Sequence, residues 1–155
     1  MKTPCAKLVK MDKGVKILVP YDGSEEAESA LNEAVDIAKA FDGSVTMLHV
    51  YWDPSETRVN KTLQATEQIS VRDEASHRIF HDKEKVLEKA GIQHKFVSIR
   101  ATNVPDTILK VAKDEDYGLI AMGSRGTGRA RSWLQGSVSQ KVIAEAGCQI
   151  GRAHV

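Results

Sequence analysis

The chain has 155 residues, which fits one domain able to bury about 70% of the surface that its unfolded chain exposes. Hydrophobic residues make up 41% and charged residues 28%, as is ordinary for a soluble globular protein. The formal net charge of +1 excludes an overall field that recruits nucleic acid or membrane, so any positive site must be local.

The amino-terminal residues carry charges but no apolar segment of the kind found in signal peptides. No apolar run approaches the roughly 20 residues needed to span a bilayer. We therefore expect a disordered lead over residues 1–13, one domain over residues 14–155, and a cytoplasmic protein. Cys5 and Cys148 lie at opposite ends without metal or redox spacing, so we expect free thiols.

A strand and a helix are predicted first. The run VKILVPYDG from Val15 is apolar without alternation, which is typical of a strand covered on both faces. A helix is expected over SEEAESALNEAVDIAKAF, because Ser24 can cap it and the following glutamates suit its positive end. Six residues form one apolar stripe along it: Ala27, Ala30, Leu31, Ala34, Val35 and Ala38.

The middle of the chain predicts a second strand and a long helix. Ser44–Tyr51 follows Gly43 and is expected to be the strand. The stretch from Trp52 to Ala65 is weakly patterned, and a helix is expected from roughly Glu67 to Ala90, with Gly91 as its stop. Four residues are expected to face inward: Ile79, Val86, Leu87 and Ala90.

His94–Arg100 predicts a third strand. Asn103 and Pro105 are placed to start a helix. Its apolar face would consist of Ile108, Val111 and Ala112.

The remaining segments predict a fourth strand over Tyr117–Gly123, a helix from about Ser137 to Ala146, and a weak fifth strand in the tail CQIGRAHV. Strands that alternate with helices predict a parallel sheet with helices on both faces. Ligands of such sheets bind beyond the carboxyl ends of the strands, where the winding direction reverses.

The stretch GSRGTGRARSWLQGS, residues 123–137, begins at the end of the fourth strand and closes where a helix begins. Gly123, Gly126 and Gly136 let main-chain N–H groups approach a ligand closely. Ser137 adds a hydroxyl at a helix N-terminus, which attracts phosphate. Three arginines can balance part of a triphosphate charge: Arg125, Arg129 and Arg131.

A flexible surface loop with solvated arginines is the plain alternative for this stretch. A P-loop is excluded because G-x-x-x-x-G-K-[ST] is absent, and GTGRAR does not complete the G-x-G-x-x-G of a dinucleotide site. Nucleic-acid binding is not expected, because the basic cluster is confined to one loop without an aromatic ladder.

The spacing G-x2-G-x9-G-[S/T] resembles the ATP-binding motif of the universal stress protein family. VKILVPYDGSEEAESAL is similar to that family's first strand and helix, LIAMGSRG to its fourth strand, and GSVSQKVI to its last helix. The resemblance implies a doubly wound five-stranded parallel sheet in the order 3-2-1-4-5, of the adenine nucleotide alpha hydrolase-like type. It also implies a homodimer, in which fifth strands pair; Gly151 and Arg152 interrupt that strand here.

The resemblance also implies which residues contact a nucleotide. Asp22 would lie near adenosine, Pro20 would shape that turn, and Val50 would meet adenine through its backbone. Met122 and Gly123 would line the ribose side. The phosphates, often with Mg²⁺ or Mn²⁺, would be held by the loop residues Arg125, Gly126, Gly136 and Ser137. For Asp22, the alternative is a plain turn residue in YDGS.

Three functions remain open from the sequence. The first is an ATP-binding switch or regulator in a stress response. The second is a slow ATPase or autophosphorylating enzyme, although Asp22 is the only carboxylate expected near the loop, so at most weak turnover is expected. The third is a nucleotide-independent, dimeric interaction protein. His77 and His81 have a spacing that can bind metal, but two ligands without a third favour a solvated helix face.

Overall fold

The computed structural model describes residues 14–51, 74–123, 137–147 and 149–153. Strands and helices alternate along these residues. The strands are β1 (Lys16–Pro20), β2 (Ser44–Tyr51), β3 (Gln93–Arg100), β4 (Leu119–Gly123) and β5 (Gln149–Ala153). The helices are α1 (Glu25–Ala40), α2 (Glu74–Lys89), α3 (Val104–Asp114) and α4 (Ser137–Glu145).

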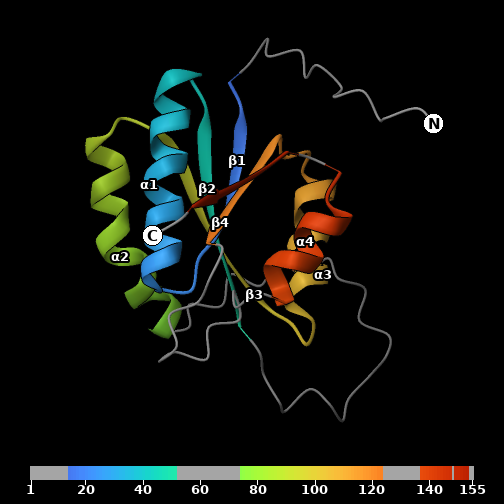
Figure 1. Cartoon of the computed structure of the whole chain (residues 1–155). Helices are drawn as coiled ribbons and strands as arrows, with labels where there is room; N and C mark the ends of the chain where they lie inside the picture. The colour runs from blue at the N-terminus through green and yellow to red at the C-terminus, as the bar shows by residue number, and fades with distance from the viewer. Residues whose placement is uncertain (1–13, 52–73, 124–136, 148, 154–155) are drawn as a thin grey trace, which may run out of the picture.

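The strands form one parallel sheet in the order β3-β2-β1-β4-β5. Helices α1 and α2 cover one face, and α3 and α4 cover the other (Figure 1). The prediction of a doubly wound α/β sheet in the order 3-2-1-4-5 is therefore confirmed. The winding direction reverses between β1 and β4.

Strand β5 forms although Gly151 and Arg152 are poor strand residues. It pairs with β4 from Leu119, opposite Gln149, to Gly123, opposite Ala153. β5 stands at the edge of the sheet, and its main-chain pairing with β4 defines it as a strand.

The core confirms the sequence pattern of α1, because all six residues of its predicted apolar stripe are buried. All of them except Ala30 belong to the same core cluster as Ile17, Leu18 and Val19 of β1, whose side chains are fully buried. In α2, Leu87 is buried as predicted, but the prediction for Val86 is wrong, because Val86 is 45% exposed. Helix α2 contacts mainly the edge strand β3. The buried face of α2 is therefore narrow, and it includes Leu87 but not the adjacent Val86.

Local signals set the helix ends. Ser24 Oγ accepts a hydrogen bond from the Ala27 N–H at 3.2 Å, and Asn103 Oδ1 accepts one from the Asp106 N–H at 3.1 Å. Gly91 has a φ of 68° and follows α2, as its predicted stop. Helix α2 ends at Lys89 rather than Ala90, and the predicted start at Glu67 lies outside the described residues. None of the helices in the described ranges is long and apolar enough to cross a membrane.

Candidate functional site

The carboxyl ends of β1 and β4 lie together at the point where the winding reverses. The two strands are paired, with Ile17 opposite Leu119 and Leu18 opposite Ile120. Pro20 ends β1 and Gly123 ends β4, and both are buried. The structure therefore brings these two predicted site residues to one edge of the sheet, the edge at which such folds bind ligands.

Asp22 lies in the turn between β1 and α1. Its Oδ1 accepts a hydrogen bond from the Ser24 N–H at 3.0 Å, and Gly23 between them has a φ of 82°. This contact shapes the turn that caps α1, so Asp22 has the role of a turn residue in YDGS. The half-buried carboxylate also stands directly beyond β1, so the two roles are compatible.

Val50 lies near the carboxyl end of β2, and its side chain is fully buried. The Leu48 carbonyl oxygen accepts a hydrogen bond from the Tyr21 N–H at 2.8 Å, so the Leu48 main chain faces β1. Main-chain N–H and C=O groups point to opposite sides of a strand at successive residues, and to the same side at every second residue. The N–H and C=O of Val50, two residues after Leu48, therefore point to the same side as those of Leu48, beyond the end of β1. This is the geometry that a backbone contact with a ligand at the switch point requires.

Gly123 is held against the first turn of α1. A Cβ atom added to Gly123 would lie 2.5 Å from Glu26 Cβ and 3.1 Å from the Glu26 carbonyl carbon. A glycine is therefore required here by helix packing, independently of any ligand. Met122, the preceding residue, is fully buried.

Glu26 is a residue that sequence reasoning missed. It is only 6% exposed, and its Oε2 has no hydrogen-bond partner among the described residues. From the sequence, Glu26 is predicted only to be an acidic residue that suits the N-terminus of a helix. The available signal is its spacing, because Glu26, Ala30 and Ala34 lie on one face of α1 and that face is buried. Glu26 adds a second carboxylate beside the carboxyl end of β4, where Asp22 alone was expected.

A group of three polar side chains that the sequence did not predict joins the end of β1 to α1 and α2. The Tyr21 hydroxyl donates a hydrogen bond to Glu28 Oε2 at 2.6 Å, and Lys83 Nζ lies 2.7 Å from Glu28 Oε1. Burial, together with this hydrogen bond, raises the pKa of Tyr21. Burial by itself raises the pKa of Glu28, but the hydrogen bonds from Lys83 and Tyr21 outweigh it and hold that pKa below its usual range. The group fixes the segment that leads into Asp22.

Replacing Glu28 with glutamine should destabilise the protein at neutral pH by about 1 kcal/mol, a value reduced by the partial exposure of the pair. Because the folded-state pKa of Glu28 is lowered, its contribution is present above the unfolded-state pKa and is lost as the pH falls through the folded-state pKa. Urea unfolding at pH 7 and near pH 3 should show the difference from wild type shrinking with acidity. Glu25→Gln, an exposed acid in the same turn, is the control, and an equal pH effect there would contradict the prediction.

The phosphate side of the predicted site is described only in part. Arg125, Gly126 and Gly136 lie outside the described residues. Ser137 is the first residue of α4, as predicted. Because α4 follows β4 in a parallel sheet, its N-terminus opens toward the edge that holds Asp22.

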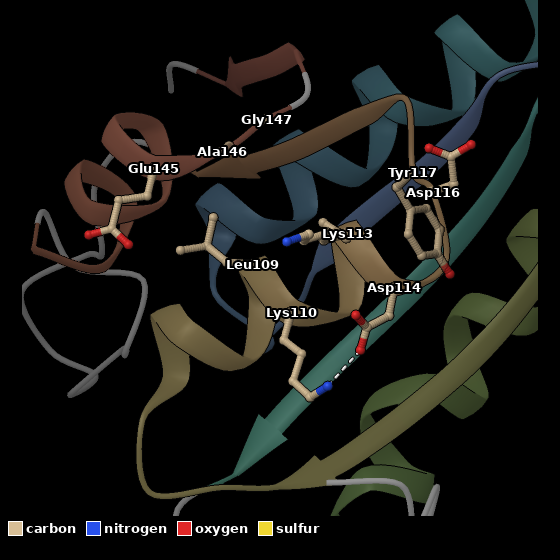
Figure 2. Close-up of a pocket in the computed structure, with 10 residues that line it drawn as sticks. Leu109, Lys110, Lys113, Asp114, Asp116, Tyr117, Glu145, Ala146 and Gly147 are labelled. Atoms are coloured by element: carbon tan, nitrogen blue, oxygen red, sulfur yellow. Dashed lines mark hydrogen bonds and ion pairs between the residues drawn. The ribbon is translucent and has the colours of Figure 1, made fainter.

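A cavity of about 650 Å³ lies elsewhere. Figure 2 shows it between the last turns of α3, the turn before β4 and the end of α4. Its rim includes the ion pair of Lys110 with Asp114, 2.6 Å apart. The cavity is at the amino end of β4, so it does not coincide with the predicted nucleotide site.

The sequence profile of the universal stress protein family matches residues 15–150. This chain belongs to the universal stress protein family. It is 32% identical to a universal stress protein of Thermus aquaticus over 138 residues, covering 86% of this chain and 94% of that protein. It is also 32% identical to the Bacillus subtilis universal stress protein YxiE over 143 residues, covering 87% and 95% of the two chains.

Several solved structures share the fold. The hypothetical protein MJ0577 is 28% identical, with a TM-score of 0.67 and coverage of 90% of this chain and 94% of that one. A universal stress protein in complex with cAMP has a TM-score of 0.67 at 19% identity, covering 91% and 97%. One from Archaeoglobus fulgidus in complex with dAMP has a TM-score of 0.62 at 18% identity, covering 92% and 98%. The last two likenesses concern the fold alone.

Proposed function

We propose that this universal stress protein binds an adenine nucleotide, with ATP as the ligand, and acts as a nucleotide-dependent switch or regulator in a stress response. The observation that carries the proposal is the placement of G-x2-G-x9-G-S directly after β4, at the edge where the sheet reverses its winding. Fold relatives in complex with cAMP and dAMP support an adenine nucleotide.

In this proposal, each predicted residue has one role. Pro20 and Asp22 shape the adenosine side, and the Val50 main chain contacts adenine. Met122 and Gly123 line the ribose side. The triphosphate is held by the loop and the start of α4, through Arg125, Gly126, Gly136 and Ser137.

The half-buried Asp22 and the buried Glu26 place carboxylate oxygens at this edge of the sheet, and such oxygens are ligands that Mg²⁺ and Mn²⁺ accept. These two carboxylates are the candidate ligands among the described residues for a divalent ion that arrives with the nucleotide. Such an ion neutralises phosphate charge when bound.

Calorimetric titration of the nucleotide-stripped protein tests the proposal. MgATP is expected to bind saturably at one site per chain. Affinity should rise from AMP through ADP to ATP, because each phosphate adds charge for the arginines and the helix N-terminus to stabilise. Equal affinities would remove the phosphate assignment, and absence of binding would favour a nucleotide-independent interaction protein.

Slow ATP hydrolysis or autophosphorylation is the second candidate, and the specific observation in its favour is a pair of carboxylates, Asp22 and Glu26, at the same edge of the sheet. Phosphoryl transfer needs a group that orients the attacking oxygen. Phosphate release should then fall in Asp22→Ala at saturating MgATP. Release that is unchanged in Asp22→Ala and in Glu26→Gln would exclude these side chains from turnover.

We also propose a cytoplasmic homodimer in which β5, an edge strand of the sheet, pairs with its copy. An unpaired edge strand offers main-chain groups that a second copy can bind. Sedimentation at micromolar concentration should give a dimer, and a 17.0 kDa species would overturn this arrangement.

A further inference from the structure

Three metal-ligating side chains meet at the end of the sheet opposite the candidate nucleotide site. Glu84 and Glu88 come from α2, and His94 comes from the start of β3, opposite Val45 in β2. One carboxylate oxygen from each glutamate and one ring nitrogen of His94 lie within 4.8 Å of one another. The glutamates are exposed and His94 is half-buried, so a dissolved ion can reach all three.

The local chain path builds this cluster. Glu84 and Glu88 are four residues apart and therefore lie on the same face of α2. The Gly91 N–H donates to the Glu88 carbonyl at 3.0 Å, and the Ile92 N–H donates to the Leu87 carbonyl at 3.3 Å. This tight turn sends the chain directly back along the helix, which places His94 beside the two carboxylates.

One ring nitrogen of His94 contacts the main chain. Its Nδ1 lies 2.8 Å from the Ile92 carbonyl oxygen. Because a carbonyl oxygen only accepts hydrogen bonds, Nδ1 is the donor in this contact, and in the neutral imidazole Nε2 is then the nitrogen available to a metal. Metal-ligating histidines have this same contact, a second ring nitrogen that donates to a carbonyl. The ring also packs at a tilt against Phe96, with centroids 5.5 Å apart.

We propose that Glu84, Glu88 and His94 bind one Zn²⁺, with Nε2 of His94 and one oxygen of each carboxylate as ligands and water in the fourth position. An imidazole beside two carboxylates suits Zn²⁺, whereas Mg²⁺ and Ca²⁺ prefer oxygen ligands throughout. Tetrahedral ligands at zinc distances are about 3.3 Å apart. Exposed glutamate side chains close that gap by rotating, and two carboxylates balance the charge of the ion.

Such a site would fasten the last turns of α2 to the edge strand β3. It stands apart from the proposed nucleotide site, and its argument does not depend on nucleotide binding. Zinc is therefore expected to raise the melting temperature in the absence of nucleotide, because it binds the folded chain. Mg²⁺ at the same concentration is expected to have no such effect.

Zinc titration of the full chain tests the proposal, with Cys5 and Cys148 replaced by serine because thiolates compete for zinc. Isothermal calorimetry should give saturable binding of one Zn²⁺ per chain. Removing a ligand in Glu84→Gln, Glu88→Gln or His94→Gln should weaken binding on the order of tenfold or more. Each variant should retain the circular dichroism spectrum of the parent.

Two variants on the same helix serve as controls. His81→Gln and Asp82→Asn remove an exposed imidazole and an exposed carboxylate outside the cluster, and zinc affinity should not change. In NMR spectra, zinc should shift the ring signals of His94. Lack of saturable binding, an unshifted His94 ring, or an equal loss of affinity in His81→Gln would overturn the proposal.

Discussion

Replacing Gly123 with alanine is expected to destabilise the protein by about 1–3 kcal/mol, the usual effect of adding atoms to a packed core. The new Cβ would lie 2.5 Å from Glu26 Cβ, 3.1 Å from the Glu26 carbonyl carbon and 3.3 Å from the Glu26 carbonyl oxygen. These atoms belong to the first turn of α1 and cannot rotate away as a side-chain end can. The helix must therefore move off β4, or the strand must bend.

Urea unfolding measures this effect, and Gly147→Ala is the matched control. A Cβ at Gly147 meets no atom within 4 Å, and its φ is not positive, so that variant should be close to wild type. Equal stability of the two variants would show that α1 does not constrain Gly123. Gly123→Ala can be folded and less stable. Any loss of nucleotide binding in this variant then reflects the displaced edge of the sheet as well as the lost ligand contact.

Valine at Gly126 or at Gly136 is expected to weaken MgATP binding by more than a hundredfold under the proposed function. A side chain there would block approach of main-chain N–H groups to phosphate. Losing two hydrogen bonds to a charged group costs roughly 3–6 kcal/mol, which corresponds to more than a hundredfold in affinity. Both glycines lie outside the described residues, so the fold of each variant is checked directly by circular dichroism.

Calorimetric titration of both variants, with Gly147→Ala as the control, tests this expectation. Circular dichroism should match the wild type in all three proteins. Wild-type affinity in both glycine variants would remove the loop from the nucleotide site. Loss of binding in the control as well would point to a general defect of the protein rather than to phosphate contacts.

The order of the elements follows from patterns within single segments. The apolar stripe of α1 is buried in full, and the helix starts at Ser24 and Asn103 are set by side-chain caps, which are local contacts. The alternation of strands and helices is enough to predict a parallel sheet, and the connections then restrict the position of a ligand to the carboxyl edge. The glycine-rich stretch is expected at that edge because it follows β4 in the sequence.

Burial of particular side chains does not follow from such patterns. Glu26 looks like a solvated acid at a helix start, yet it is buried because β4 passes beneath it. Val86 looks like part of an apolar stripe, yet it is exposed because α2 covers only an edge strand. In both cases, a neighbour distant in sequence decides the environment.

By itself, the sequence determined the kinds of elements, their order, the class of sheet and the location of the candidate phosphate loop, because periodicity and capping act over a few residues. Only the tertiary structure decided that Glu28 pairs with Lys83 across 55 residues, that Glu26 lies against Gly123, and that His94 meets the glutamates of α2. The pattern of residues along a helix or strand indicates which of its faces is apolar. The packing of whole elements selects the partner of each polar group, and that selection depends on all of the chain at once.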